Sequence, residues 1–232
     1  MTYCVGLLLD QGLVLASDSR TNAGVDYISS YSKLHLFQPA PDRIFVLLAA
    51  GSLATTREVV DRIRRDLDQA AHPSSSHLDP GVNLLNANYL FEAANYIGQV
   101  SLAVQNEHGP ALRQVGVSAE ATFILGGQIA GQPQGLLLIY PQGNAIAATP
   151  ETPYLQIGES KFGKPVLDRI AYPGLSLDDG ARLCLVSLEG TARSNLTVAP
   201  PFEVAICPRD QLALSHRLRL DNDSPELQAL TA

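Results

Sequence analysis

Short apolar runs bounded by turn residues open the chain and predict strands. Residues 3–9 and 13–16 flank Asp10-Gln11-Gly12, which favours a hairpin with Gly12 in its turn. Residues 33–37 and 44–50 form a second pair of runs. The prolines of the intervening residues 38–43 cannot donate ladder hydrogen bonds, so we expect a loop there and four strands before any helix.

The apolar period changes from two to nearly four after Ser52. Leu53, Val60, Ile63 and Leu67 fall on one face of a helix, and this pattern predicts an amphipathic helix. A Pro- and Ser-containing stretch ends it, and residues 84–104 repeat the helical period. Two consecutive helices therefore follow the first strands.

The second half of the chain repeats this order of strands and then helices. The Gly-rich residues 126–131 are interpreted as a hairpin turn between strands, and Ser176 begins a capping-box pattern for a helix. The predicted strands are 121–125, 135–140, 145–148, 202–207 and an edge strand within 212–220, and the predicted helices are 164–171 and 177–190.

This succession of strands and helix pairs predicts an α+β fold, namely a four-layer αββα sandwich with two antiparallel sheets between helical layers. At 232 residues one domain spanning the whole chain, 1–232, is the expectation. The polar residues after about 221 are expected to form a flexible tail.

Composition excludes several partners and cofactors. The net charge of −7 without a basic stripe argues against nucleic acid and anionic membranes. Apolar runs fall far short of the roughly 18 residues that span a bilayer, and we expect no secretory signal and a cytoplasmic protein. The three cysteines and five histidines lack metal-binding spacing, so no metal or other cofactor is predicted.

The position of Thr2, directly after Met1, suggests a catalytic role. Removal of Met1 would leave a threonine with a free α-amine, whose pKa of about 7.7–8.0 lets a fraction accept the proton of the same residue's hydroxyl at neutral pH. Nucleophile and general base would then be one residue. A second-position threonine is common by chance, so this feature alone decides nothing.

Three further segments give Thr2 a context. They are ASDSRTNAG at 16–24, Lys33 at the start of the third predicted strand, and AAGSLA at 49–54. With MTYCVG at the start and RSNLTV at 193–198, the chain resembles proteasome β-type subunits and, among them, the bacterial Anbu family. The resemblance spans most of the chain.

This resemblance implies a set of catalytic roles. Thr2 matches the nucleophile, Asp18 the acid that orients a catalytic lysine, Lys33 that lysine, and Gly51 the residue whose N–H forms the oxyanion hole. An ammonium beside the hydroxyl would favour alkoxide character. Singly, Asp18 is also typical of a turn, Lys33 of a solvated strand end, and Gly51 of a hinge before a helix N-cap.

The resemblance also implies a substrate pocket and partners. Thr21, Ala49 and Leu53 are expected to line the pocket beside the scissile bond, which favours hydrophobic substrate residues. The implied partners are other copies of the chain, in a ring or a helical arc, and a peptide or unfolded-protein substrate. Whether an unfoldase delivers the substrate is unknown from the sequence.

Three positions depart from the proteasome pattern. Ser194 stands where an aspartate is expected, and Glu159 and Ser160 replace part of a Gly-Ser-Gly element near the threonine amine. A carboxylate there would raise the pKa of the amine and weaken it as a base. These departures favour one alternative to a peptidase, a catalytically weak or inactive assembly subunit. A second alternative, an amidase or acyltransferase acting on a small amide, is compatible with the same nucleophile.

Overall fold

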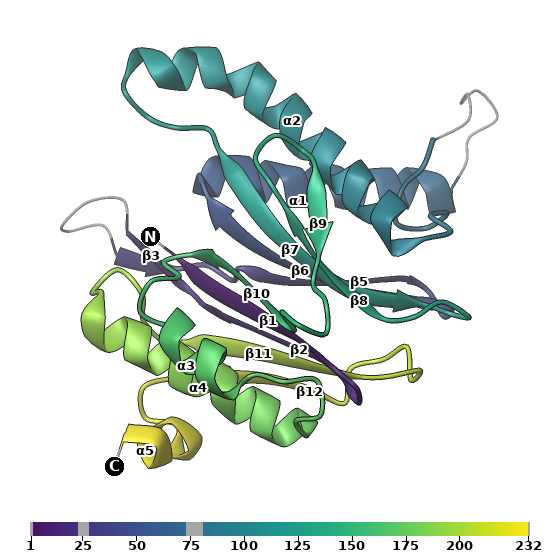
Figure 1. Cartoon of the computed structure of the whole chain (residues 1–232). Coiled ribbons are helices and arrows are strands. Elements are labelled where there is room, and N and C mark those ends of the chain that lie inside the picture. Colours follow the sequence, from purple (N-terminus) through teal and green to yellow (C-terminus); the bar gives the residue numbers. More distant parts are fainter. Residues whose placement is uncertain (1, 23–27, 73–80, 232) are drawn as a thin grey trace.

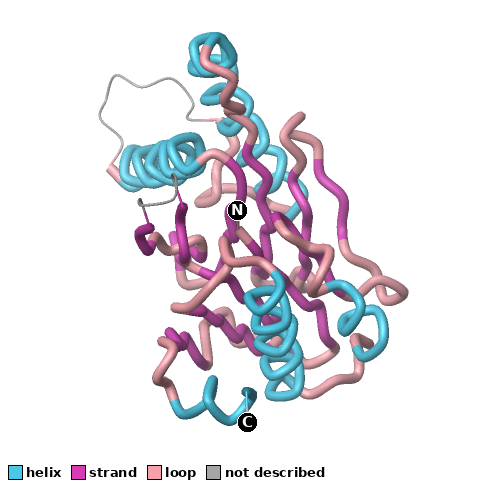
Figure 2. The backbone as a smooth tube through the Cα atoms, turned by 90° about the vertical axis from the view of Figure 1, so that its left-hand side faces the viewer, coloured by secondary structure: helices cyan, strands magenta, loops and turns pink. Residues whose placement is uncertain are grey.

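The computed structural model describes residues 2–22, 28–72 and 81–231. Two five-stranded antiparallel sheets stack face to face, and helices cover both outer surfaces (Figure 1). The predicted αββα sandwich is confirmed. Seen from the side, the strands occupy the middle of the molecule with helices above and below them (Figure 2).

The first sheet has the order β10-β1-β2-β11-β12 and carries the start of the chain. Its outer face is covered by α3 and α4. Its elements are β1 (Tyr3–Leu9), β2 (Gly12–Asp18), β10 (Tyr154–Gly158), β11 (Phe202–Pro208), β12 (His216–Leu220), α3 (Lys164–Ile170) and α4 (Leu177–Ser194).

The second sheet has the order β5-β6-β7-β8-β9, and α1 and α2 cover it. Strands β3 and β4 form a separate two-stranded ribbon. The elements are β3 (Arg20–Asn22), β4 (Ile28–Ser30), β5 (Leu34–Ala40), β6 (Arg43–Gly51), α1 (Leu53–Ala71), α2 (Leu90–Gln114), β7 (Ala121–Ile129), β8 (Gly135–Ile139) and β9 (Ala145–Ala147).

Strict alternation along the strands builds the core. On β2, Leu13 and Leu15 face the other sheet, whereas Val14 and Ala16 face the helices, and all four are buried. Because successive strand residues point to opposite faces, this strand serves two apolar layers at once. The active-site candidates sit where the alternation ends, at the Asp18 end of the strand.

Three predicted boundaries differ from the structure. Strand β7 runs through the Gly126-Gly127 pair that was predicted to turn, because a Cβ at position 127 would lie 2.4 Å from the carbonyl of Ile44 on the neighbouring strand. Helix α2 begins later than predicted, where Glu92 accepts hydrogen bonds from the amides of Asn88 and Tyr89, and it continues through Pro110. The predicted loop at 38–43 is mostly strand, with an irregular register near Ala40.

Four elements were not predicted, namely β3, β4, β10 and the C-terminal helix α5 (Pro225–Thr231). Helix α5 falls in the segment that was expected to be a flexible tail. Its Leu227 is 5% exposed and packs in the core layer below the first sheet. The helix was not predicted because one apolar side chain in a polar segment does not reveal that a helix docks there.

Candidate active site

The backbone around Thr2 is held on both sides. The amide of Glu159 donates to the carbonyl of Thr2 at 2.7 Å, and the amide of Tyr3 donates to Asp18 Oδ1 at 2.9 Å. A Cβ on Gly158 would lie 2.0 Å from the Thr2 carbonyl oxygen, so only glycine lets β10 approach this closely. Thr2 is therefore fixed between the ends of β2 and β10.

Lys33 and Asp18 form a buried ion pair beside Thr2. Lys33 Nζ donates to Asp18 Oδ1 at 2.7 Å and to the Arg20 carbonyl at 2.7 Å, and the two side chains are 7% and 0% exposed. Burial raises the pKa of the Asp18 carboxyl, and the Lys33 ammonium opposes that rise. The solvated strand-end position that Lys33 alone would suggest is excluded, since the side chain is buried.

Gly51 ends β6 with φ of +115°, and a Cβ there would meet the Glu120 carbonyl at 2.3 Å. Ser52 follows as the N-cap of α1 and its Oγ accepts from the Thr55 amide. The position is thus a strand-to-helix hinge and, at the same time, an exposed backbone on the wall of a cavity.

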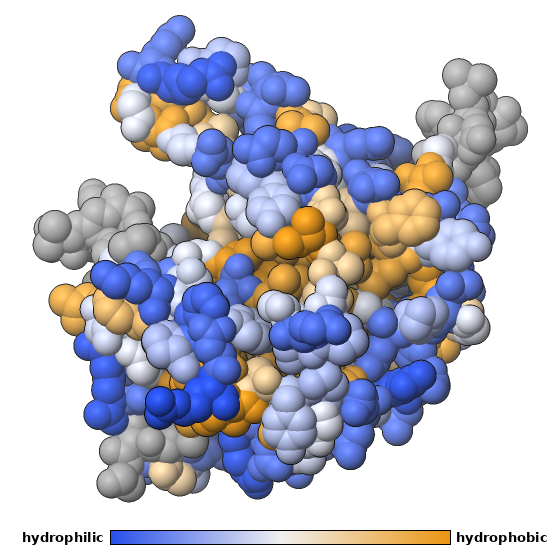
Figure 3. All heavy atoms as spheres, viewed as in Figure 1, coloured by the Kyte–Doolittle hydropathy of each residue, from blue (hydrophilic) through white to orange (hydrophobic). Residues whose placement is uncertain are grey.

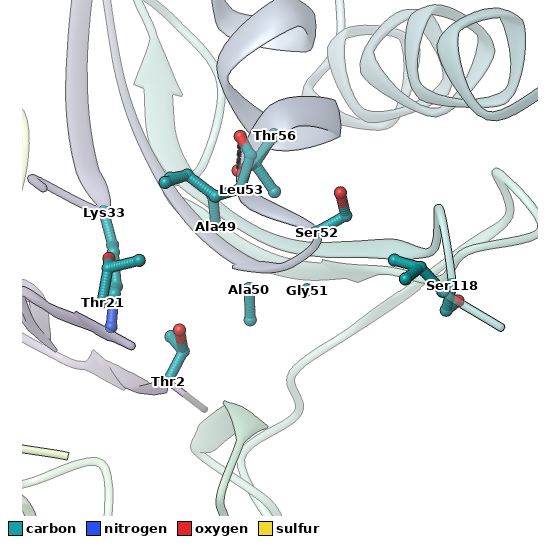
Figure 4. A pocket seen from close by; sticks show the side chains of 11 residues that line it. Thr2, Thr21, Lys33, Ala49, Ala50, Gly51, Ser52, Leu53, Thr56 and Ser118 are labelled. Carbon is teal, nitrogen blue, oxygen red and sulfur yellow. Dashed lines mark hydrogen bonds between the residues drawn. The ribbon is translucent and has the colours of Figure 1, made fainter. Parts of the chain in front are cut away.

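A cavity of about 360 Å³ brings the predicted residues together. Figure 4 shows Thr2 between two walls, with Lys33 and Thr21 on one side and Ala50 and Gly51 on the other. Six residues that sequence reasoning selected line it, Thr2, Thr21, Lys33, Ala49, Gly51 and Leu53. Asp18 lies behind Lys33 in the protein interior.

Sequence reasoning missed five residues of this cavity. Ala50 and Ser52 are the sequence neighbours of Gly51, and Thr56 lies in the first turn of α1. Val117 and Ser118 come instead from the connection between α2 and β7. No local motif marks that connection, and the pairing of Gly51 with Ala121 is what brings it to the cavity.

The three departing positions, Glu159, Ser160 and Ser194, do not line the cavity. Ser194 is exposed at the end of α4, and the amide of Ser160 donates to the Gly158 carbonyl. Glu159 Oε2 accepts from Asn195 Nδ2 at 2.9 Å. Sequence reasoning missed Asn195, although it lies in the RSNLTV segment immediately after Ser194.

A metal is not needed to explain the polar clusters. Within the described ranges, Glu58, Glu107 and His108 are near enough to share an ion, but the Arg62 guanidinium already pairs with both carboxylates. His108 binds Glu58 at 2.8 Å. His35 is buried, and burial, with the charges of neighbouring arginines, lowers its pKa to about 4, so its imidazole is neutral at pH 7. Among the described helices, none has the length and apolar character of a membrane span.

Two stacked antiparallel sheets between helical layers, with a threonine beside a buried lysine at one end, define the N-terminal nucleophile hydrolase fold in its proteasome β-subunit form. Three solved structures agree with this class over the whole length. Anbu from Yersinia bercovieri is 41% identical, with a TM-score of 0.87, and the match covers 99% of this chain and 91% of that one. The chain belongs to the Anbu family.

The other two structures give the same result. A Gly-1 mutant of Anbu from Hyphomicrobium sp. strain MC1 is 39% identical with a TM-score of 0.88, and the match covers 100% of this chain and 92% of that one. The helical assembly of the Anbu complex from Pseudomonas aeruginosa is 39% identical with a TM-score of 0.88, and the match covers 99% and 90%. No family model and no curated protein matches the chain.

Proposed function

We propose that this chain is a proteasome-like threonine peptidase whose nucleophile is Thr2. The observation that carries the proposal is the shared cavity, where Thr2, Lys33 and Gly51 face the same space and Asp18 holds Lys33 from behind. Nucleophile, charge stabiliser and backbone donor are the groups that acyl transfer requires.

The reaction follows from these groups. Once Met1, which lies outside the described residues, is removed, the free amine of Thr2 accepts the proton of Thr2 Oγ1 as that oxygen attacks the substrate carbonyl. The Gly51 N–H stabilises the tetrahedral oxyanion. The Thr2 ammonium then gives its proton to the departing amine, leaving an ester on Thr2. Water, deprotonated by the same amine, hydrolyses that ester and releases the acid.

Lys33 would contribute through its charge. Its ammonium donates to Asp18 and Arg20, both of which fix its position. A fixed positive charge beside Oγ1 stabilises the alkoxide character that develops during attack, and this needs no reorganisation of the site at that moment. Asp18 also binds the Tyr3 amide, so one carboxylate orients both the lysine and the chain next to the nucleophile.

The walls of the cavity favour apolar substrate residues. Ala49 and Leu53 are apolar, Thr21 is small, and among the lining residues of the described chain Lys33 is the charged one. Peptides with leucine before the scissile bond are therefore expected to be cleaved at least tenfold faster than matched peptides with lysine or glutamate. Release of a fluorogenic amine from such a series tests this, with Thr2→Ala as the blank. Faster cleavage after lysine or glutamate would contradict the proposed pocket.

A second candidate function is that of an assembly subunit without peptidase activity. It is favoured by Ser194, which stands where proteasome β subunits have an aspartate and is exposed at the end of α4 instead of lining the cavity. The same peptide series separates the two functions. A peptidase cleaves at least one member at a rate that Thr2→Ala abolishes. An inactive subunit cleaves none of them.

Self-association is part of the proposal. The Pseudomonas aeruginosa relative is a helical assembly, and this chain exposes large apolar side chains such as Phe91, Ile146 and Tyr172. Figure 3 shows apolar groups gathered in a band across the middle of one face. We expect oligomers in sedimentation velocity at micromolar concentration. A single monomer peak under these conditions would contradict self-association.

A further inference from the structure

A continuous chain of hydrogen bonds links Thr2 to the turn that follows α4. The Thr2 carbonyl accepts from the Glu159 amide at 2.7 Å, and Glu159 Oε2 accepts from Asn195 Nδ2 at 2.9 Å. Asn195 Oδ1 accepts in turn from the amide and hydroxyl of Thr197, at 3.0 and 2.6 Å. The first two of these bonds join residues from different parts of the fold, and the bonds between Asn195 and Thr197 lie within the turn.

The same turn is tied to the lysine side of the site. Arg20 Nη1 donates to the Leu196 carbonyl at 2.9 Å, and the Arg20 carbonyl accepts from Lys33 Nζ at 2.7 Å. Lys33 binds Asp18, which accepts from the Tyr3 amide. The bonds therefore run from the carbonyl of Thr2, through the 195–197 turn, back to the amide of the next residue.

We propose that Asn195 is a positioning residue, which holds Glu159 and thereby keeps the end of β10 closed on Thr2. Its consequence for catalysis rests on the proposed function, but its effect on the position of Thr2 does not.

The oxygen and the nitrogen of the Asn195 side-chain amide have different hydrogen-bond partners. The Thr197 amide can only donate, so it must face Oδ1, and this directs Nδ2 toward the carboxylate of Glu159, which accepts. Aspartate would still accept from Thr197 but would offer Glu159 a like charge instead of a donor. Asn195 also terminates α4, where its own amide donates to the Thr191 carbonyl. The helix end thus sets where the side chain points.

Asn195→Asp isolates the link to Glu159, because it keeps the turn. Thr197→Val is the matched control, since it removes a hydroxyl on the other side of Asn195 and leaves the Asn195–Glu159 bond in place. The double variant Asn195→Asp/Glu159→Gln restores the bond with donor and acceptor exchanged.

Hydrogen–deuterium exchange at the Glu159 amide tests the positioning directly, because that N–H is the one bound to Thr2. We expect Asn195→Asp to speed its exchange at least tenfold, the double variant to recover most of the protection, and Thr197→Val to stay within twofold of the parent. Unchanged exchange in Asn195→Asp, or an equal rise in Thr197→Val, would overturn the proposal.

Labelling of Thr2 by an electrophilic peptide measures the consequence. Displacement of a nucleophile by about 1 Å can cost a factor of 10², so we expect Asn195→Asp to label about 10- to 100-fold more slowly and the double variant to recover. A parent that does not label refutes the peptidase proposal, and the exchange measurement still decides the role of Asn195. A parent that does label, but no faster than Asn195→Asp, refutes the positioning proposal alone.

Discussion

Lys33→Ala is expected to slow acylation of Thr2 by about 10²- to 10⁴-fold, the range for a group that assists proton transfer or stabilises charge in a transition state. The reason is the loss of a fixed ammonium beside the nucleophile, since Lys33 is held at 2.7 Å by Asp18 and lines the same cavity as Thr2. Single-turnover labelling with an electrophilic peptide measures this step alone. Lys33→Arg keeps the charge but changes its reach, so it should also label poorly while leaving the site paired.

A structural effect must be separated from the catalytic one. Removing Lys33 leaves Asp18 buried without a counter-charge, which typically costs about 3–5 kcal/mol. Burial then raises the Asp18 pKa with backbone hydrogen bonds, such as that from the Tyr3 amide, left to oppose it, so the folded state of Lys33→Ala binds a proton that the unfolded state releases above about pH 4. The destabilisation is therefore greatest at neutral pH and shrinks as the pH falls toward that range.

The double variant Lys33→Met/Asp18→Asn supplies the control. It removes both charges, and the amide oxygen of asparagine can still accept from the Tyr3 amide. We expect it to be more stable than Lys33→Ala at pH 7 and equally unable to label. Parent-like labelling by either variant would remove the lysine from the mechanism and leave Thr2 activated by its own amine alone.

Gly51→Ala should have the second large effect, on both stability and activity. Its φ of +115° is unfavourable for any side chain, and the new Cβ would lie 2.3 Å from the Glu120 carbonyl, which belongs to backbone and cannot swing aside. Strand β6 would have to separate from β7 where the oxyanion donor is proposed. We expect at least about 3 kcal/mol of lost stability and, in protein that folds, a loss of about 10²-fold or more in acylation.

Gly131→Ala is the matched control for the free-energy cost of a side chain at a positive φ. Gly131 has φ of +75° in the exposed turn between β7 and β8, and a Cβ there would meet nothing within 4 Å. That substitution should cost about 1–2 kcal/mol from conformation alone and leave labelling unchanged. Denaturant unfolding of both variants gives the comparison. Equal costs would show that the contact with Glu120 is not what requires glycine at position 51.

The period of the apolar residues and the turn-forming residues predicted the architecture, but they did not predict every helix and strand. The apolar runs along residues 3–16 and the helical period after Ser52 were sufficient, because these strands bury both of their faces and the helix buries one. The ribbon β3–β4 has strands of three residues, too short to show a period. The Gly126-Gly127 pair was wrongly predicted to form a turn. Glycine is required at position 127 by the close approach of the neighbouring strand, and the sequence alone does not show which strands are neighbours.

The residues of the candidate site were likewise predicted only in part from the sequence. Thr2, Asp18, Lys33 and Gly51 came from the resemblance to proteasome β subunits, and the structure places Thr2, Lys33 and Gly51 around one cavity with Asp18 behind them. Val117 and Asn195 could not be found in this manner. Val117 reaches the cavity through the pairing of β6 with β7, and Asn195 reaches Glu159 across 36 positions of sequence. Such contacts are properties of tertiary structure.

Thr2 is proposed as the chain's nucleophile, with a free amine. Intact mass and peptide mapping of the purified protein, before and after reaction with an electrophilic peptide, test it most directly. If Thr2 has this role, the purified protein lacks Met1 and gains one adduct per chain, on Thr2, and a Thr2→Ala variant gains none. A protein that quantitatively retains Met1, or an adduct on any other residue, would contradict it, because a blocked amine cannot act as the base.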